Sequence, residues 1–259
     1  DKMNESYDAI TVRPTDSSIG VNISVEKAFA AYENGTAIPE IAEHFADAVE
    51  KGFRESPQVD LESLSDYEQM KSKLSMEVVS AEKNAELLES VPHERMEDMA
   101  VVYRFVLDQT DSGNGTILVT NQLLDQYGIT KEQLRADAME NAPEIRPSEI
   151  RGMSEVMSEL APGMIPEVAP EDEQMFVATV PDKIHGAGVI AYPNFMEDAA
   201  QKMGGDFFVL PSSIHEVLLV KDNGQMTAKE LENMVKEVNA TQVEPADQLT
   251  DHVYHYDSQ

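Results

Sequence analysis

A strand–strand–helix order occurs three times between residues 99 and 241, and this pattern constrains the fold more than any other feature of the chain. In each unit, two short apolar segments flank a turn, and a polar residue then starts an amphipathic segment. The expected elements are strands 100–107 and 116–120 with a helix from Asn121, strands 175–180 and 189–192 with a helix from Asn194, and strands 207–210 and 217–220 with a helix from Thr227. Strands joined by short turns pair antiparallel. The sequence therefore predicts an α+β fold, with a largely antiparallel or mixed sheet and helices on one face.

Two helices are expected before the first of these units. Ser24 can start a helix that ends at the turn residues Asn34-Gly35. Apolar residues then recur at steps of three and four from Ile38 to Phe53, which indicates a second helix with one buried face. Later in the chain, Glu230 stands three residues after Thr227, the spacing of a capping box.

These patterns suggest how the chain is divided. Residues 161–173 contain three prolines with charged flanks, so they form either a linker between two lobes or a long surface crossing. We prefer one α+β domain with a helical segment in front of it. The expected parts are a polar, flexible arm over residues 1–19, a helical appendage over 20–66 and the α+β domain over 67–259.

The charge of the chain narrows its possible partners. It has 49 acidic and 19 basic residues, a formal net charge of −30, and the acids are spread along its whole length. Such a surface repels phosphate backbones and anionic lipid headgroups, so nucleic acid and membrane are not expected partners. A basic protein partner fits better, while the oligomeric state stays open. The apolar stretches are also far shorter than the roughly 20 residues that cross a bilayer.

The cysteine content bears on chemistry and location. The chain has no cysteine, which removes disulfides, thiolate metal sites and thiol nucleophiles together. We expect a soluble cytoplasmic protein without a bound cofactor. The sequence begins at Asp1 without an initiator methionine, so a removed leader, and with it secretion, stays open.

One candidate polar cluster lies between two apolar segments that are expected to be buried. Ser212, Ser213, His215 and Glu216 supply the residue types of a hydroxyl nucleophile, a base and an orienting acid. They lack the glycine-flanked turn that exposes a serine nucleophile. Ser213 and Glu216 also have the spacing of a capping box, a structural alternative that leaves His215 unexplained.

A second cluster lies near the C-terminus. In a strand, His252, Tyr254 and Tyr256 would share one face, and Asp251 would lie on the other. A metal site needs about three protein ligands, and His215 is the possible third, so we assign no metal site and expect His215 to contact the 251–257 strand.

Four phrases of the sequence together resemble a known family: 141–151 (NAPEIRPSEIR), 210–217 (LPSSIHEV), 238–243 (VNATQV) and 251–254 (DHVY). The chain resembles the bacterial domain-of-unknown-function family number 5688 from about Gly20 to its C-terminus, with the Asp1 to Ser18 arm outside the resemblance. The resemblance implies a soluble bacterial protein of intracellular type and carries over no catalytic residue. We therefore expect a non-catalytic protein-interaction or accessory module. The alternative is a hydrolase-like or metal-dependent enzyme where His215 meets Asp251 and His252.

Overall fold

The computed structural model describes residues 9–12, 21–55, 63–110, 113–163, 168–258. Most of the 1–19 arm, residues 56–62 and 111–112, and the middle of the 161–173 segment therefore lie outside the described residues. The arm is not wholly irregular, because Ala9–Val12 form strand β1, which pairs antiparallel with β2 (Val21–Ser24).

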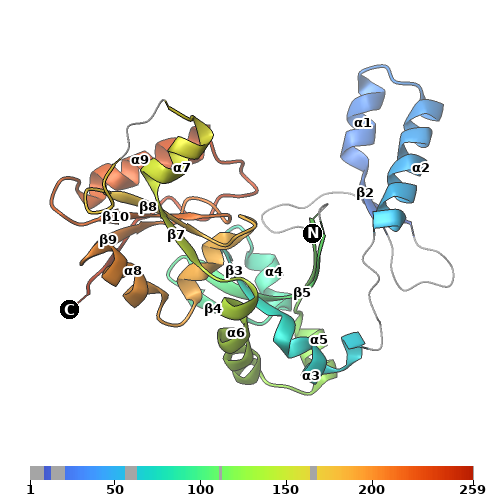
Figure 1. The fold of residues 1–259 in the computed structure, drawn as a ribbon. Helices are drawn as coiled ribbons and strands as arrows, with labels where there is room; N and C mark the ends of the chain where they lie inside the picture. Colours follow the sequence, from blue (N-terminus) through green and yellow to red (C-terminus); the bar gives the residue numbers. More distant parts are fainter. Residues whose placement is uncertain (1–8, 13–20, 56–62, 111–112, 164–167, 259) are drawn as a thin grey trace.

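A helical hairpin follows β2 and stands apart from the rest of the chain in Figure 1. It consists of α1 (Val25–Glu33) and α2 (Ile38–Glu55), and Gly35 takes the positive φ of 90° that the turn requires. Ser24 is the N-cap residue of α1, although its side chain makes no capping hydrogen bond. The predicted face of α2 is only partly buried, at Ile41, Phe45, Val49 and Phe53. No described side chain of α1 or α2 is fully buried, because the two helices pack mainly on each other and on β1–β2.

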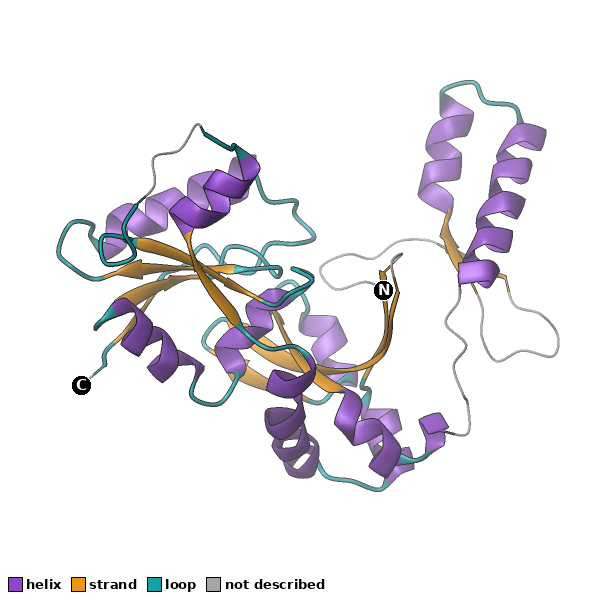
Figure 2. Cartoon of the chain, viewed as in Figure 1, coloured by secondary structure: helices purple, strands orange, loops and turns teal. Residues whose placement is uncertain are grey.

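The main body contains two antiparallel sheets with helices, so the α+β class is confirmed (Figure 2). The four-stranded sheet has the order β3-β5-β4, and β6 also pairs with β5. Its strands are β3 (Leu74–Ser80), β4 (His93–Met96), β5 (Met99–Thr110) and β6 (Gly113–Leu118). Around this sheet lie η1 (Ser63–Ser65), α3 (Tyr67–Met70), η2 (Lys71–Lys73), α4 (Ala85–Ser90), α5 (Asn121–Tyr127) and α6 (Lys131–Ile145).

The five-stranded sheet has the order β11-β9-β10-β8-β7. Its strands are β7 (Glu149–Gly152), β8 (Met175–Thr179), β9 (Phe207–Leu210), β10 (Val217–Lys221) and β11 (Tyr254–Tyr256). The accompanying helices are α7 (Met153–Leu160), η3 (Gly186–Ala191), α8 (Phe195–Met203) and α9 (Ala228–Thr241). Helices lie on both faces in Figure 1, because alternate residues of β9 face opposite ways: Phe207 and Val209 belong to the core beside α8, and Phe208 and Leu210 pack with α9.

Turn and cap residues set the ends of several helices. Thr227 and Glu230 form the expected capping box at the start of α9. Gly128 ends α5 in the left-handed conformation, and Thr130 then caps α6. The prediction of a strand over 189–192 is wrong, since this segment belongs to the 3₁₀-helix η3 and its C-cap.

Candidate functional site

Histidine–carboxylate contacts recur through the main body. Four histidines each lie close to a carboxylate: His185 to Glu77 at 2.8 Å, His215 to Asp247 at 3.5 Å, His252 to Asp98 at 2.8 Å and His255 to Asp222 at 2.9 Å. The first and third of these pairs join the four-stranded sheet to the half of the molecule that contains the five-stranded sheet. Their surroundings decide which of them can serve a ligand.

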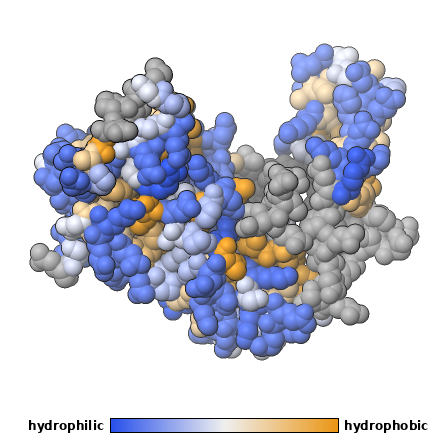
Figure 3. Space-filling model, in the orientation of Figure 1, coloured by the Kyte–Doolittle hydropathy of each residue, from blue (hydrophilic) through white to orange (hydrophobic). Residues whose placement is uncertain are grey.

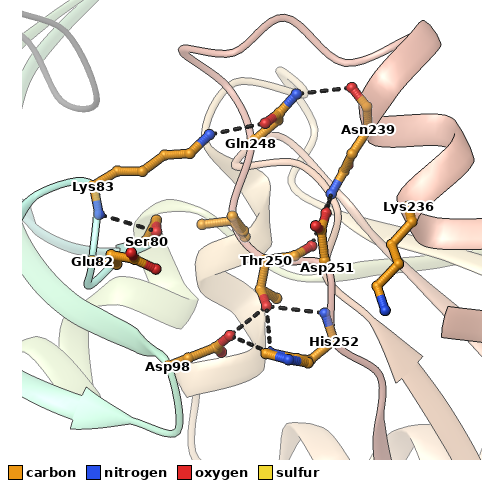
Figure 4. A pocket seen from close by; sticks show the side chains of 11 residues that line it. Ser80, Glu82, Lys83, Asp98, Lys236, Asn239, Gln248, Thr250, Asp251 and His252 are labelled. Carbon is orange, nitrogen blue, oxygen red and sulfur yellow. Dashed lines mark hydrogen bonds and ion pairs between the residues drawn. The ribbon is translucent and has the colours of Figure 1, made fainter.

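The Asp98–His252 pair lines a pocket of about 570 Å³ (Figure 4). Three parts of the chain form this pocket: the turn between β3 and α4, the turn between β4 and β5, and α9 together with the segment before β11. The charged lining residues are Lys83, Lys236 and His252 on the basic side, and Glu82, Asp98 and Asp251 on the acidic side. The volume lies in the range typical of small-molecule sites.

Asp98 accepts hydrogen bonds from three side chains. Its Oδ2 accepts from Thr250 and from Nδ1 of His252 at 2.8 Å, and its Oδ1 accepts from the Tyr254 hydroxyl. Partial burial would raise the pKa of Asp98, but hydrogen bonds from Thr250, Tyr254 and His252 lower it below its ordinary value of 3.8. The same contact with Asp98 raises the pKa of His252 above 6.5. Because the ionised carboxylate holds the proton on Nδ1, the second ring nitrogen, Nε2, is left for a ligand.

The opposite wall of the pocket is fixed by α9. Nδ2 of Asn239 donates to the carbonyl oxygen of Thr250 at 2.9 Å and to Oδ1 of Asp251 at 2.7 Å. Asn239 is only 6% exposed, and its Oδ1 has no hydrogen-bond partner among the described residues. The amide therefore holds the Asp251 carboxylate beside α9.

Lys83 closes the pocket on the side of the four-stranded sheet. Its Nζ donates to Oε1 of Gln248 at 2.9 Å and to the carbonyl oxygen of Pro245 at 3.1 Å. Gln248 in turn donates to the carbonyl oxygen of Asn239 at 2.8 Å. The pocket wall is thus a hydrogen-bonded chain that runs from the β3–α4 turn to α9.

The two sheets are joined at two places: the Asp98–His252 contact is the first joint, and the Glu77–His185 contact is the second. Glu77 is buried in the middle of β3. Its carboxylate accepts from Nε of Arg104 at 2.7 Å and lies 2.8 Å from Nδ1 of His185. Burial would raise the pKa of Glu77, but the hydrogen bond from His185 and the charge of Arg104 hold it below its ordinary value. The His185 ring stacks on the His215 ring, and the His185 backbone N–H donates to Nδ1 of His215.

Two glycines allow this close packing. A Cβ on Gly188 would lie 2.2 Å from the carbonyl oxygen of Met76 in β3, and a Cβ on Gly186 would lie 2.1 Å from the Thr179 hydroxyl in β8. Any side chain at either position would collide with its neighbours, so glycine lets η3 lie against both sheets. Gly186 thus faces the five-stranded sheet, and Gly188 faces the four-stranded sheet.

The residues of the first predicted cluster form part of the second joint. The Ser213 hydroxyl accepts from the His215 backbone N–H, so Ser213 makes a serine turn instead of the expected capping box, and Glu216 is exposed. The Ser212 carbonyl accepts from the Leu249 N–H, which places this segment antiparallel to residues 247–249. These contacts give Ser213 and His215 structural roles.

The predicted contact of His215 with the C-terminal cluster takes a different form. The carboxylate beside His215 is Asp247, four residues before Asp251, while His252 and Tyr254 converge on Asp98. The structure therefore places Asp251 and His252 in the pocket lining, with Tyr254 donating to Asp98 beside them. The residues of the first predicted cluster lie around the other joint: Ser212, Ser213, His215 and Glu216.

Sequence reasoning missed the residues on the four-stranded sheet. Asp98 lies in a turn with other acids nearby, and no local signal distinguishes it. Glu77 carried a signal, because it is a charge within a strand whose other residues suit a core. Within the described residues, no three metal-ligating side chains gather as a metal site, and no helix is long and apolar enough to cross a membrane.

A family model for a family of unknown function, DUF5688, matches residues 1–258. The chain belongs to this family. The match includes the Asp1 to Ser18 arm, which corrects the expectation that the arm lies outside the resemblance. No curated protein and no solved structure matches the chain. Membership in DUF5688 assigns no reaction, so we infer function from the geometry.

Proposed function

We propose that this DUF5688 protein is a non-catalytic interaction or accessory module that binds a basic protein partner. The binding surface is the helical hairpin of α1 and α2. One observation carries the proposal: this hairpin presents large apolar side chains that no described part of the chain covers. Phe29 is 60% exposed, Tyr32 is 55% exposed and Ile38 is 66% exposed.

The apolar side chains are close together in the hairpin. Phe29 and Tyr32 are three residues apart on α1, so they lie on one face, and Ile38 begins α2 just after the turn. In Figure 3, apolar side chains reach the surface of the hairpin between hydrophilic ones. Scattered single apolar residues are ordinary on a protein surface, whereas a group of them rimmed by charge is typical of an interaction site.

The charge of the hairpin supports a basic partner. Residues 25–55 contain seven acidic and three basic residues, a net charge of −4. The whole chain has a net charge of −30, so its long-range field attracts cationic surfaces as well. A basic helix with an apolar stripe has the matching chemistry, since an amphipathic helix can bury its stripe against such a surface.

Site-specific photo-crosslinking in cells of the source organism tests this proposal. A photoreactive phenylalanine analogue replaces Phe29 in one variant and Ile38 in a second. The control replaces Leu160, which is 75% exposed on α7 in the main body. We expect the same partner to crosslink from both hairpin positions and not from Leu160, and its purified complex to weaken as salt concentration rises.

Three outcomes contradict the proposal. Equal crosslinking of one protein from Leu160 would remove the hairpin as the specific surface. A hairpin that crosslinks only to a second copy of the chain, together with a dimeric mass in sedimentation, would replace the partner by self-association. No adduct from either hairpin position would leave the exposed apolar residues without an interaction role.

A further inference from the structure

The pocket beside Asp98 and His252 combines charges of both signs. Its basic lining residues are Lys83, Lys236 and His252, and its acidic ones are Glu82, Asp98 and Asp251. With His252 protonated, the three positive and three negative charges balance. A ligand that matches this lining carries both charges and no net charge, so the negative field of the whole chain does not repel it.

Lys236 is the basic side chain best able to serve a ligand. Lys83 already donates to Gln248 and Pro245 within hydrogen-bonding distance. The ion pair of Lys236 is with Glu232 on the same helix, and its N–O distance of 3.8 Å is longer than a hydrogen bond. In Figure 4 the Lys236 side chain extends from α9 toward the His252 end of the pocket.

The charged groups around His252 also indicate that an anionic group can bind at this end of the pocket. Asp98 raises the pKa of His252, and Lys236, which lowers it, extends toward this histidine in Figure 4, so two cationic groups share this end of the pocket when His252 is protonated. Because Nδ1 of His252 is bound to Asp98, Nε2 can donate to an anionic group that lies between the imidazolium and the ammonium. A carboxylate fits that place.

The acidic partner for the other end of a ligand stands next to Lys236. Lys236 and Asn239 are three residues apart on α9 and therefore lie on one face of this helix. Asn239 holds one oxygen of Asp251 at 2.7 Å, which leaves the second carboxylate oxygen as an acceptor. Glu82 lines the side of the pocket across from α9 and is exposed (Figure 4). Asp251 and Glu82 are thus two lining carboxylates that can accept from an ammonium group.

We propose that this pocket binds a small zwitterion of the amino-acid or dipeptide class, with its carboxylate on Lys236 and His252 and its ammonium on Asp251 and Glu82. The volume of about 570 Å³ admits such a molecule, and Leu249 supplies an apolar part of the lining for its side chain. This site is separate from the helical hairpin, so its test does not depend on the proposed partner.

Isothermal titration calorimetry with the full chain at pH 6 tests the site, with glycyl-leucine as the probe. N-acetyl-glycyl-leucine lacks the ammonium group, and glycyl-leucinamide lacks the carboxylate. We expect wild-type protein to bind glycyl-leucine and to bind each blocked form roughly tenfold more weakly, because each loses charge-assisted hydrogen bonds.

Two variants assign the two ends of the ligand. Lys236→Gln should reduce the difference between glycyl-leucine and its amide, because only His252 then holds the carboxylate. Asp251→Asn should reduce the difference between glycyl-leucine and its acetylated form, because only Glu82 then holds the ammonium. Asn at 251 keeps an oxygen that accepts from Asn239, so the wall of the pocket is retained. Lys229→Gln is the matched control, since Lys229 is exposed on the same helix but does not line the pocket.

The proposal is overturned if wild-type protein does not bind glycyl-leucine, or if it binds all three compounds equally. Equal losses in Lys236→Gln and Lys229→Gln would also overturn it, because the effect would then come from general charge. Thermal unfolding of each variant without ligand establishes that a loss of binding is not a loss of folding.

Discussion

The pairs Glu77–His185 and Asp98–His252 both join the two halves of the molecule through a carboxylate and a histidine, yet they differ in their surroundings. The Glu77 side chain is 2% exposed and also holds Arg104, whereas the His252 side chain is 61% exposed and lines a pocket. The Glu77 carboxylate is fully engaged by Arg104 and His185 within the protein. The second pair leaves a ring nitrogen of His252 for the proposed ligand, so one carboxylate–histidine contact serves structure while the other lies where we propose binding.

The burial of the first pair predicts the largest effect. Glu77→Ala leaves Arg104 and His185 without their carboxylate where little water can replace it, and we expect the free energy of unfolding to fall by about 3–5 kcal/mol. Urea unfolding at pH 7 measures this change. The control is Asp222→Ala, which removes the carboxylate beside His255 at an exposed site and should cost about 1 kcal/mol or less. Equal losses in the two variants would refute the distinction between buried and exposed pairs.

The difference between the two joints also explains what the sequence could predict. Local signals found the elements whose ends depend on turn and cap residues, such as Thr227 with Glu230 at the start of α9 and Asn34-Gly35 after α1. The 3₁₀-helix η3 was missed because Gly188 is required by contact with Met76, a residue more than a hundred positions earlier. Periodicity within a segment carries no information about such a contact.

The candidate site was half predictable for the same reason. Asp251, His252 and Tyr254 belong to one short segment whose residue types and alternation stand out. Asp98 becomes recognisable only when the turn between β4 and β5 meets that segment across the two sheets. The sequence predicted that His215 contacts the 251–257 segment, which is close to the true contact. Because Ser213 pairs with Gln248, the carboxylate beside His215 is instead that of Asp247.

The second prediction concerns the charge of Asp98. Asp98→Asn keeps a hydrogen-bond acceptor but removes the charge, so we expect the pKa of His252 to fall toward 6.5 and stability at pH 6 to drop by roughly 1–2 kcal/mol. Histidine NMR titration measures the pKa, with His252→Gln to assign the signal. An unchanged pKa in the variant would show that Asp98 does not govern this histidine.

The same pair predicts how stability depends on pH. The folded pKa of Asp98 lies below 3.8, so its contribution is lost as pH falls through that folded value. The folded pKa of His252 lies above 6.5, so its contribution is complete below 6.5 and is lost as pH rises through the folded value. The difference in stability between wild type and Asp98→Asn should therefore be largest between about pH 4 and 6.5.

The smallest effect tests whether Tyr254 supports Asp98 or only packs on the sheet. Tyr254→Phe removes one of the three donors to this carboxylate while it keeps the ring, and we expect a loss of roughly 0.5–1 kcal/mol in urea unfolding. The pKa of Asp98 should rise toward 3.8, while the contact between Asp98 and His252 persists. Tyr256→Phe on the same strand is the control, because the Tyr256 ring packs on Phe207 and its hydroxyl has no hydrogen bond among the described residues. If both substitutions leave stability and the Asp98 titration unchanged, the Tyr254 hydroxyl does not stabilise the carboxylate, and Thr250 and His252 alone orient it.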